Sequence, residues 1–299
     1  MRVLILGSSG QLGKSLCAEL ESNKIIYAAF SHAELDITNS LFLERAINDF
    51  LPSVVINAAA YTDVDNAENY EDLAYSVNAC GPKNIARICN QLDVTLIHIS
   101  TDYVFDGNQE IPYRPSDLVC PDSVYGKTKL AGEEHIKNIC NKYLIIRTSW
   151  LFSQYAGNFL TTMINLAYTK RSISVVSDQI GNPTNALHLS RAIVFALIKI
   201  ESSRFTSGIY HYGDKENCTW HEFAEYIFEV MFNNNQLTDP LDVKAILSSE
   251  YHSLVPRPKY SAIDSTDFCE QFDSPHFSWK EDLSETINRY IASSKQGTL

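Results

Sequence analysis

Val3-Leu4-Ile5-Leu6-Gly7-Ser8-Ser9-Gly10-Gln11-Leu12-Gly13 is the stretch that decides the fold of this chain. The apolar run Val3–Leu6 predicts a buried strand, and the glycines after it predict a tight turn into a helix over Gln11–Glu21. Glycine lets the backbone approach an anion closely, and the helix N-terminus offers free N–H groups to it. The spacing is G-x-x-G-x-x-G. Within a strand–turn–helix unit it predicts a site for the pyrophosphate of a dinucleotide.

Outward from this unit, apolar runs and helical stretches alternate through the first half of the chain. We expect strands at Val3–Leu6, Ile25–Ala29, Val54–Ile56, Thr95–Ile99 and Leu144–Ile146. We expect helices at Gln11–Glu21, Leu41–Phe50, Leu73–Asn90 and Tyr125–Cys140, with Asp36 or Thr38 as the N-cap of the second. Continuous apolar strands separated by helices indicate a parallel sheet covered on both faces. Residues 1–150 are therefore predicted to form a doubly wound, Rossmann-like α/β domain that binds a dinucleotide.

The pattern loosens after Trp150. Helices are expected at Asn158–Lys170, Ala186–Ile200, Thr219–Phe232 and Lys280–Ala292, and short strands at Ile173–Val176 and Ile209–Tyr212. The Asn-, Pro- and Ser-rich stretch 233–260 is predicted to be mostly loop. Residues 151–299 are interpreted mainly as a smaller substrate-binding lobe, with segments that return to the first sheet.

The composition narrows the classes of function that the chain can have. The 299 residues carry a net charge of −12, which argues against binding to nucleic acid. The seven cysteines include no C-x-x-C pair and the eight histidines no H-x-x-x-H spacing, so neither disulfides nor a metal site are expected. No apolar run approaches the roughly 20 residues of a membrane span, and the chain starts in a strand rather than a leader peptide. We therefore expect a cytoplasmic protein.

Tyr125 and Lys129 stand at positions i and i+4 of a predicted helix, and therefore on one face of it. A free phenol has a pKa of about 10, and a nearby ammonium group lowers it towards the working pH. Such a pair also arises by chance, but Ser100 and Thr101 directly follow the fourth predicted strand. Ligands of open α/β sheets bind beyond the carboxyl ends of the strands. The three elements together predict nicotinamide-dependent reduction of a carbonyl group.

Several longer segments carry a family resemblance: Gly10–Gly13, Leu35–Thr38, Val55–Thr62, Ser100–Gly107, Val124–Glu133, Arg147–Trp150, Val176–Thr184, and Arg257-Pro258 followed by Ser261. In these segments the chain resembles the extended short-chain dehydrogenase/reductases, and within them the dTDP-4-dehydrorhamnose reductase family. The resemblance implies reduction of the C4 keto group of dTDP-4-dehydro-L-rhamnose to dTDP-L-rhamnose, for polysaccharide biosynthesis, with NADPH or NADH.

The resemblance also implies residue roles. Tyr125 would donate a proton to the C4 oxygen, Thr101 would polarise the carbonyl, and Lys129 would bind the nicotinamide ribose while it tunes Tyr125. The other residues expected at the cofactor are Gly7, Gly10, Gln11, Leu12, Ser31, Asp36, Ile37, Ala58, Ala59, Ala60 and Tyr61. Those expected at the substrate are Asp102, Trp150 (packed on the sugar), Asn158, Gln179 and Arg257, the last with a guanidinium fork for the diphosphate.

The chain departs from the family at four places. Some members bind Mg²⁺ through glutamates at positions held here by Ser15 and Leu187, so we expect a monomer or a homodimer without a metal bridge. Pro115 replaces a usual acid, and nothing in the sequence explains that change. Phe30-Ser31-His32 offers neither an Asp for a ribose 2′-hydroxyl nor an Arg for a 2′-phosphate, which leaves both cofactors open with a slight preference for NADPH.

Two alternatives stay open at this point. The first is a reductase or epimerase of another nucleotide-linked keto-sugar; a 4,6-dehydratase is disfavoured because Asp102-Tyr103 stands where those enzymes have Asp-Glu. The second is a non-catalytic dinucleotide-binding regulatory subunit like that of methionine adenosyltransferase, since a fold alone does not define activity. The exact sugar, the nucleotide base and the oligomeric state do not follow from the sequence.

Overall fold

The computed structural model describes residues 1–155, 157–202 and 204–296. Its strands are β1 Arg2–Leu6, β2 Ile26–Phe30, β3 Val54–Asn57, β4 Thr95–Thr101, β5 Tyr143–Thr148, β6 Leu151–Phe152, β7 Ser172–Val176, β8 Ile180–Gly181, β9 Thr184–Asn185, β10 Gly208–His211, β11 Cys218–Thr219 and β12 Asp242–Ile246. Its α-helices are α1 Gln11–Ser22, α2 Ser40–Phe50, α3 Val64–Ala67, α4 Glu71–Tyr75, α5 Gly81–Gln91, α6 Val124–Ile139, α7 Phe159–Ala167, α8 Ala186–Glu201, α9 Trp220–Asn233, α10 Thr266–Phe272 and α11 Leu283–Gln296. Shorter turns are η1 Ser76–Cys80, η2 Asp102–Val104 and η3 Ser248–Glu250.

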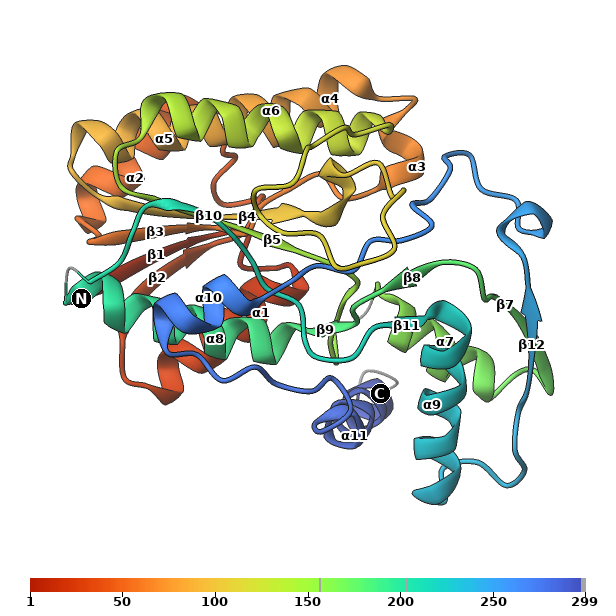
Figure 1. Ribbon diagram of the computed structural model, residues 1–299. Coiled ribbons are helices and arrows are strands. Elements are labelled where there is room, and N and C mark those ends of the chain that lie inside the picture. Colours follow the sequence, from red (N-terminus) through yellow and green to blue (C-terminus); the bar gives the residue numbers. More distant parts are fainter. Residues whose placement is uncertain (156, 203, 297–299) are drawn as a thin grey trace.

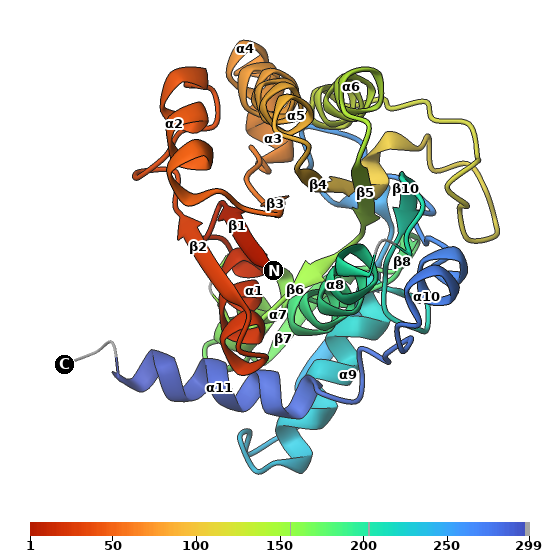
Figure 2. The same ribbon diagram turned by 90° about the vertical axis from the view of Figure 1, so that its left-hand side faces the viewer.

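A parallel sheet in the order β10-β5-β4-β3-β1-β2 forms the centre of the molecule (Figure 2). Helices α2, α4, α5 and α6 cover one face, and α1 and α8 cover the other (Figure 1). The doubly wound α/β fold predicted from the sequence is confirmed. No helix among the described residues is long and apolar enough to cross a membrane.

Strand β1 explains why both faces are covered. Val3 and Ile5 pack into a core with α1 and α8, whereas Leu4 and Leu6 pack into a second core with α2 and α5. All four side chains are fully buried, because successive residues of a strand point to opposite faces. An unbroken apolar run is therefore what a strand between two helical layers needs.

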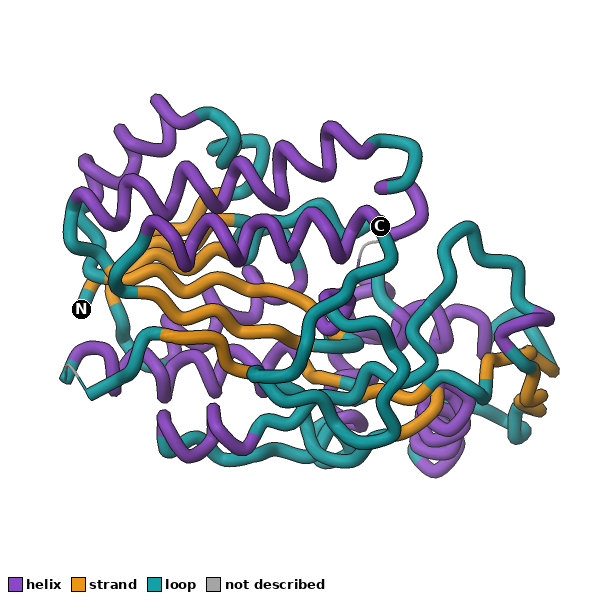
Figure 3. Tube along the Cα trace, turned by 45° about the horizontal axis from the view of Figure 1, so that its top comes forward, coloured by secondary structure: helices purple, strands orange, loops and turns teal. Residues whose placement is uncertain are grey.

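The second half of the chain contributes to both parts of the molecule. Strand β10 pairs with β5 and extends the central sheet, and α8 lies beside α1 on one of its faces. Helices α7, α9 and α11 pack around a separate apolar core that includes Phe223 and Trp279. This C-terminal lobe lies beyond the carboxyl ends of the sheet strands (Figures 1 and 3). Residues 297–299 of the predicted lobe lie outside the described residues.

Two details of the first half differ from the sequence-based expectation. Asn39, rather than Asp36 or Thr38, caps α2 by accepting a hydrogen bond from the Phe42 N–H, because Asp36 accepts from the N–H and hydroxyl of Thr38 instead. The expected single helix from Leu73 to Asn90 is broken by the π turn η1, in which the Gly81 N–H donates to the Ser76 carbonyl. Pro82 follows, and its missing N–H cannot continue the α-helical pattern.

The second half holds elements that the sequence did not indicate. Strand β12 lies in the stretch expected to be loop and pairs in parallel with β7. Helix α10 was not predicted either, although Phe268 and Phe272 place two fully buried rings against the central sheet. Both elements are short, and their stability comes from tertiary packing rather than from local sequence preference.

A buried histidine joins three distant segments of the fold. On α8, His188 Nδ1 lies 2.6 Å from Asp214 and Nε2 lies 3.0 Å from Asp282. Burial alone would lower the pKa of His188, but the hydrogen bonds and charges of the two carboxylates raise it overall. When the ring is protonated both ring nitrogens donate, and the imidazolium then ties α8 to the segment after β10 and to the start of α11.

We expect the contacts of His188 with Asp214 and Asp282 to make the free energy of unfolding depend on pH. Because the pKa of His188 is higher in the folded than in the unfolded protein, its protonation stabilises the fold. This contribution is fully present below the unfolded pKa of about 6.5, and it is lost as the pH rises through the folded pKa. The free energy of unfolding, measured by denaturant titration, should therefore fall as the pH rises above about 6.5.

His188→Asn should lower the free energy of unfolding at pH 6 by about 3 kcal/mol, because it removes one partner of a buried ionic group. It should also remove the decline with pH. The exposed residue His32 provides the control, as His32→Asn should keep both values. A decline of equal size in His188→Asn would show that another group causes it.

Candidate active site

A cavity of about 420 Å³ opens at the carboxyl ends of the central strands. Residues expected at the cofactor and substrate that line it are Gly10, Gln11, Leu12, Ala58, Ala60, Thr101, Asp102, Tyr125, Lys129, Trp150 and Asn158. Ser100, which was expected near a substrate carbonyl, also lines it, and the lining residues that were not expected are Thr62, Val64, Ile99, Tyr103, Thr148, Ser149, Leu151, Gly157, Phe159 and Trp220. The sheet and the C-terminal lobe therefore meet in one hollow, which contains most of the predicted site.

The glycine loop fits a dinucleotide by its close packing. Gly7 has a φ of +86°, and a Cβ there would lie 2.6 Å from the Ala59 nitrogen. At Gly13 a Cβ would lie 2.2 Å from the Gly7 carbonyl oxygen, so the helix starts directly against the turn. No side chain caps this end of α1, and its first helical hydrogen bond runs from Lys14 to Gly10. The N–H groups of the first turn therefore have no side-chain cap, and Gly10, Gln11 and Leu12 line the cavity where an anion would bind.

Two buried asparagines hold the opposite wall of the cavity. Asn57 accepts from the Ala59 N–H at 3.1 Å. Asn78 accepts from the Tyr61 N–H at 2.8 Å and donates to the Tyr61 carbonyl at 3.0 Å. The loop 58–61 is thus fixed at both ends. Neither asparagine was predicted as a site residue, although Asn57 lies within the segment Val55–Thr62 that carries the family resemblance.

Ser31, Asp36 and Ile37 lie outside the cavity lining. The Ser31 N–H and hydroxyl donate to the Glu34 carboxylate at 2.8 and 2.7 Å. Asp36 holds Thr38, as described above, and Ile37 is buried against α5, where Gly81 leaves room for it. These residues shape the segment after β2, and their predicted contacts with the adenosine part of a cofactor stay predictions.

Tyr125 and Lys129 face the cavity from α6, beside Thr101 at the end of β4. Burial raises the pKa of Tyr125, and a hydrogen bond with Thr101 opposes that rise. The Lys129 ammonium donates to the Ile99 carbonyl at 2.6 Å, and burial lowers its own pKa to about 8 despite the charge of Glu133. The expected lowering of the Tyr125 pKa is therefore wrong for the protein alone, since burial dominates. The phenol stays protonated near neutrality, which is the form that can donate a proton.

Asp102 is a buried carboxylate with one free oxygen. Its Oδ1 accepts from the Thr101 hydroxyl at 3.0 Å, and its Oδ2 has no partner among the described residues. Burial raises the pKa of Asp102 to about 6, against hydrogen bonds from Ser261, from Thr101 and from the backbone. At neutral pH it is mostly ionised, so Asp102 lines the cavity as a hydrogen-bond acceptor.

A buried ion pair supports the residues that face the cavity. Arg147 of β5 binds Glu133 of α6 through two hydrogen bonds, at 3.0 and 2.7 Å. The Ser100 hydroxyl donates to the same carboxylate at 2.5 Å. Glu133 lies one helical turn after Lys129, so this pair fixes α6 against the ends of β4 and β5. Ser100 was expected near a substrate carbonyl, but its hydroxyl is used in this support.

Asn158 connects the glycine loop to the C-terminal lobe. It caps α7 by accepting from the Thr161 N–H, and its amide donates to the carbonyls of Ser153 and Tyr155 and to the Gln11 side chain. Gln11 in turn donates to the Leu151 carbonyl at 3.1 Å. Both residues therefore hold the junction of the two parts of the site together, whatever else they bind.

Gln179 and Arg257 lie outside the cavity lining. Gln179 is buried beside β8. The Arg257 guanidinium donates to Asp65 at 2.7 Å, and its other terminal nitrogen, Nη1, has no partner among the described residues. Its carbon lies 6.0 Å from the centre of the Tyr103 ring, which does line the cavity. One arm of the expected fork is therefore paired with a carboxylate, and the other is buried without a partner among the described residues.

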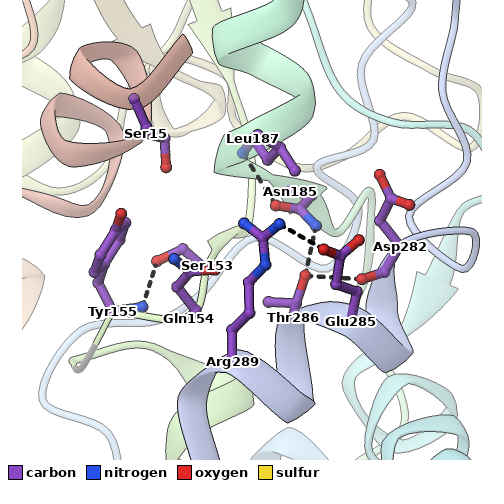
Figure 4. Close-up of a pocket in the computed structure, with 11 residues that line it drawn as sticks. Ser15, Ser153, Gln154, Tyr155, Asn185, Leu187, Asp282, Glu285, Thr286 and Arg289 are labelled. Atoms are coloured by element: carbon purple, nitrogen blue, oxygen red, sulfur yellow. Dashed lines mark hydrogen bonds and ion pairs between the residues drawn. The ribbon is translucent and has the colours of Figure 1, made fainter. Parts of the chain in front are cut away.

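A second, smaller cavity is lined by Ser15 and Leu187, which stand where some family members have Mg²⁺-binding glutamates (Figure 4). Leu187 supplies no ligand, and Ser15 donates to the Gln11 carbonyl. The carboxylates of Asp282 and Glu285 are already paired, the first with His188 and Arg191 and the second with Arg289. The described residues hold no cluster that fits a metal ion. The absence of a metal-bridged dimer stays a prediction.

The fold and the larger cavity define a Rossmann-type dinucleotide-binding protein. The sequence model of the RmlD substrate binding domain family matches residues 1–292. A dTDP-4-dehydrorhamnose reductase of Aggregatibacter actinomycetemcomitans is 38% identical over 286 residues, which are 94% of this chain and 97% of that protein. The chain therefore belongs to the RmlD substrate binding domain family.

Solved structures agree in fold over nearly the whole length. A crystal structure of a dTDP-4-dehydrorhamnose reductase from Clostridium acetobutylicum is similar with a TM-score of 0.88 and 38% identity, covering 96% of this chain and 99% of that one. One from Bacillus anthracis, in complex with NADP, has a TM-score of 0.86 and 36% identity, covering 98% of this chain and 99% of that one.

Gly7→Ala should weaken dinucleotide binding about tenfold or more, because a side chain at this φ is strained and its Cβ would displace the Ala58–Ala59 peptide. Titration of the protein with NADPH, followed by fluorescence, measures the affinity. Gly208→Ala is the control, since its Cβ would meet only the Tyr210 ring at 3.5 Å. Equal affinity of Gly7→Ala and wild type would mean that the turn does not approach the cofactor.

Proposed function

We propose that this chain reduces the C4 keto group of dTDP-4-dehydro-L-rhamnose to dTDP-L-rhamnose with NADPH or NADH. The observation that carries the proposal is the meeting of Thr101, Tyr125 and Lys129 in one cavity beside the glycine loop. Family membership supports it, since the relatives above are named for this reaction. The reaction needs a proton donor and a hydride donor on one carbonyl group.

The residues at the end of β4 and on α6 perform the proton transfer. The keto oxygen accepts hydrogen bonds from the hydroxyls of Tyr125 and Thr101, and Tyr125 gives its proton to that oxygen as the carbonyl is reduced. The nicotinamide supplies the hydride to C4 of the sugar when it is bound. Lys129 holds the nicotinamide ribose, and its positive charge stabilises the phenolate that Tyr125 becomes.

The substrate side is shared between the sheet and the lobe of residues 151–299. Asp102 accepts a hydrogen bond from a sugar hydroxyl, and Trp150 and Asn158 bound the sugar from the other side. Arg257 and Gln179 act towards the nucleotide, where a guanidinium suits a diphosphate. Gly7, Gly10, Gln11 and Leu12 hold the cofactor pyrophosphate, and Ser31, Asp36 and Ile37 lie on its adenosine side.

We further propose that the protein acts in the cytoplasm, as a monomer or as a homodimer without a metal bridge. The seven cysteines are all free, which suits a reducing compartment. The paired carboxylates of the small cavity support the absence of the bridge. The mass of the protein in solution should therefore be the same with Mg²⁺ and with a chelator.

The decisive experiment follows the absorbance of NADPH and, separately, NADH while the preceding enzymes generate dTDP-4-dehydro-L-rhamnose in the same tube. Oxidation that needs the sugar and yields dTDP-L-rhamnose would establish the function and the cofactor preference. If the dinucleotide binds but is not oxidised, the activity belongs to another keto-sugar, or the chain is a regulatory subunit.

Tyr125→Phe should lower kcat by about 100-fold or more, because it removes the proton donor, while the cofactor affinity stays nearly unchanged. Steady-state kinetics and a separate NADPH titration measure the two effects. Tyr168→Phe, at an exposed tyrosine after α7 and outside the cavity lining, is the matched control. Wild-type turnover in Tyr125→Phe would exclude it from the acid role.

The lowered pKa of Lys129, about 8, predicts an alkaline limit to activity. The charged form is the one required, so kcat/KM should fall above about pH 8 as the ammonium loses its proton. Lys129→Arg should flatten this limb, because a guanidinium stays charged, even if its activity is lower overall. A profile that remains level to about pH 9.5 would contradict the assigned role.

A further inference from the structure

We propose that Trp220 and Gly181 clamp Trp150 edge-on to the cavity, so that its indole N–H donates a hydrogen bond to an oxygen of the nucleotide-linked sugar. Trp220 is then a positioning residue for substrate binding. The inference rests on the proposed function for the identity of the ligand, and on the geometry of three residues for the rest.

Both faces of the Trp150 ring are covered. The Trp220 ring is stacked on one face, with ring centres 3.5 Å apart and planes 7° from parallel. A Cβ on Gly181 would lie 2.4 Å from Cε2, 2.6 Å from Nε1 and 2.8 Å from Cζ2 of Trp150. Distances that similar to three adjacent ring atoms place Gly181 over the ring rather than beside its edge. Because Trp220 already covers one face, Gly181 lies on the other.

The sequence resemblance led us to expect that the sugar would pack on the Trp150 ring. With both faces occupied by protein, a sugar can meet only the edge of the ring. That edge carries the single polar atom of the side chain, Nε1, which is a donor and cannot accept. Among the described residues, no hydrogen-bond acceptor is paired with this N–H, and Trp150 lines the cavity.

The backbone fixes Trp150 in this position. It has a φ of +44°, in the left-handed region that a residue with a large side chain rarely adopts. Its carbonyl accepts from the Thr184 N–H at 3.2 Å, and the next residues pair as β6 with β9. The surrounding structure must therefore hold a strained conformation, which is common where a side chain is aimed at a ligand.

Trp220 is held equally firmly from the other side. It is the first residue of α9, directly after Thr219, which forms a capping box with Glu222. Its ring also packs against Phe159, with ring centres 4.6 Å apart. The stack consequently connects the end of the first sheet to the core of the C-terminal lobe, and Trp220 determines the angle at which Trp150 enters the cavity.

Three variants separate the parts of this proposal. Trp150→Phe keeps a ring for stacking but removes the N–H, and should raise KM for the keto-sugar about tenfold with a smaller change in kcat. Trp220→Ala leaves the N–H but frees the ring, and should raise KM to a similar extent. Trp220→Phe restores a stacking partner and should return KM close to the wild-type value.

A second readout reports the stack without any turnover. Two stacked indoles give a coupled pair of bands in the circular dichroism spectrum, which should vanish in both Trp150→Phe and Trp220→Ala. Trp279→Phe is the control, because that third tryptophan donates to the Glu216 carbonyl and packs on Phe223, away from the cavity. Its spectrum should keep the coupled bands, and its KM should stay near that of the wild type.

The outcomes distinguish this proposal from the function on which it rests. Coupled bands that are missing in the wild type would overturn the clamp, whatever the activity. Coupled bands with an unchanged KM in Trp150→Phe or Trp220→Ala would overturn the role in binding, while the reductase function would stand. A wild type that binds dinucleotide and shows the bands, but does not reduce the keto-sugar, would overturn the proposed function and with it the ligand assigned to Trp150.

Discussion

The buried ion pair between Glu133 and Arg147 is the interaction on which the geometry of the site depends. Its two hydrogen bonds join α6 to β5, and Ser100 adds β4. Because Lys129 precedes Glu133 by one helical turn, the pair also sets the depth at which the reactive face of α6 meets the sheet. A buried pair of charges adds little to stability compared with apolar packing, but it tolerates few alternative arrangements. The ion pair therefore fixes the position of α6 more than it raises the free energy of unfolding.

Most of the sheet could be predicted because its determinants are local. An apolar run such as Val3–Leu6 must be buried on both faces. The glycines after it indicate a tight turn into a helix. Similarly, Thr101 and Tyr125 could be placed at the cavity because each follows from its position in a strand–loop or helix pattern, while their roles stay predictions. The cofactor contacts of Ser31, Asp36 and Ile37 remain predictions, since these residues are engaged in turns and core packing.

What the sequence could not indicate depends on contacts between distant segments. Strand β12 forms because β7 lies beside it. Trp220 is ordinary in its own segment, and only the fold places it in the cavity wall, stacked on Trp150. The raised pKa of Tyr125 likewise reflects how deeply α6 is buried, which a spacing of four residues does not reveal.

Helix α8 and strand β10 lie in the second half of the sequence, and this affects how the chain can fold during its synthesis. One face of the sheet is covered jointly by α1, near the start, and α8, which ends at Glu201, and the sheet edge at β5 is completed only at His211. A nascent chain that has emerged only as far as Trp150 would still expose that apolar face and a free strand edge, both of which invite association. The N-terminal half therefore has to wait for much of the second half to leave the ribosome before its own core can close.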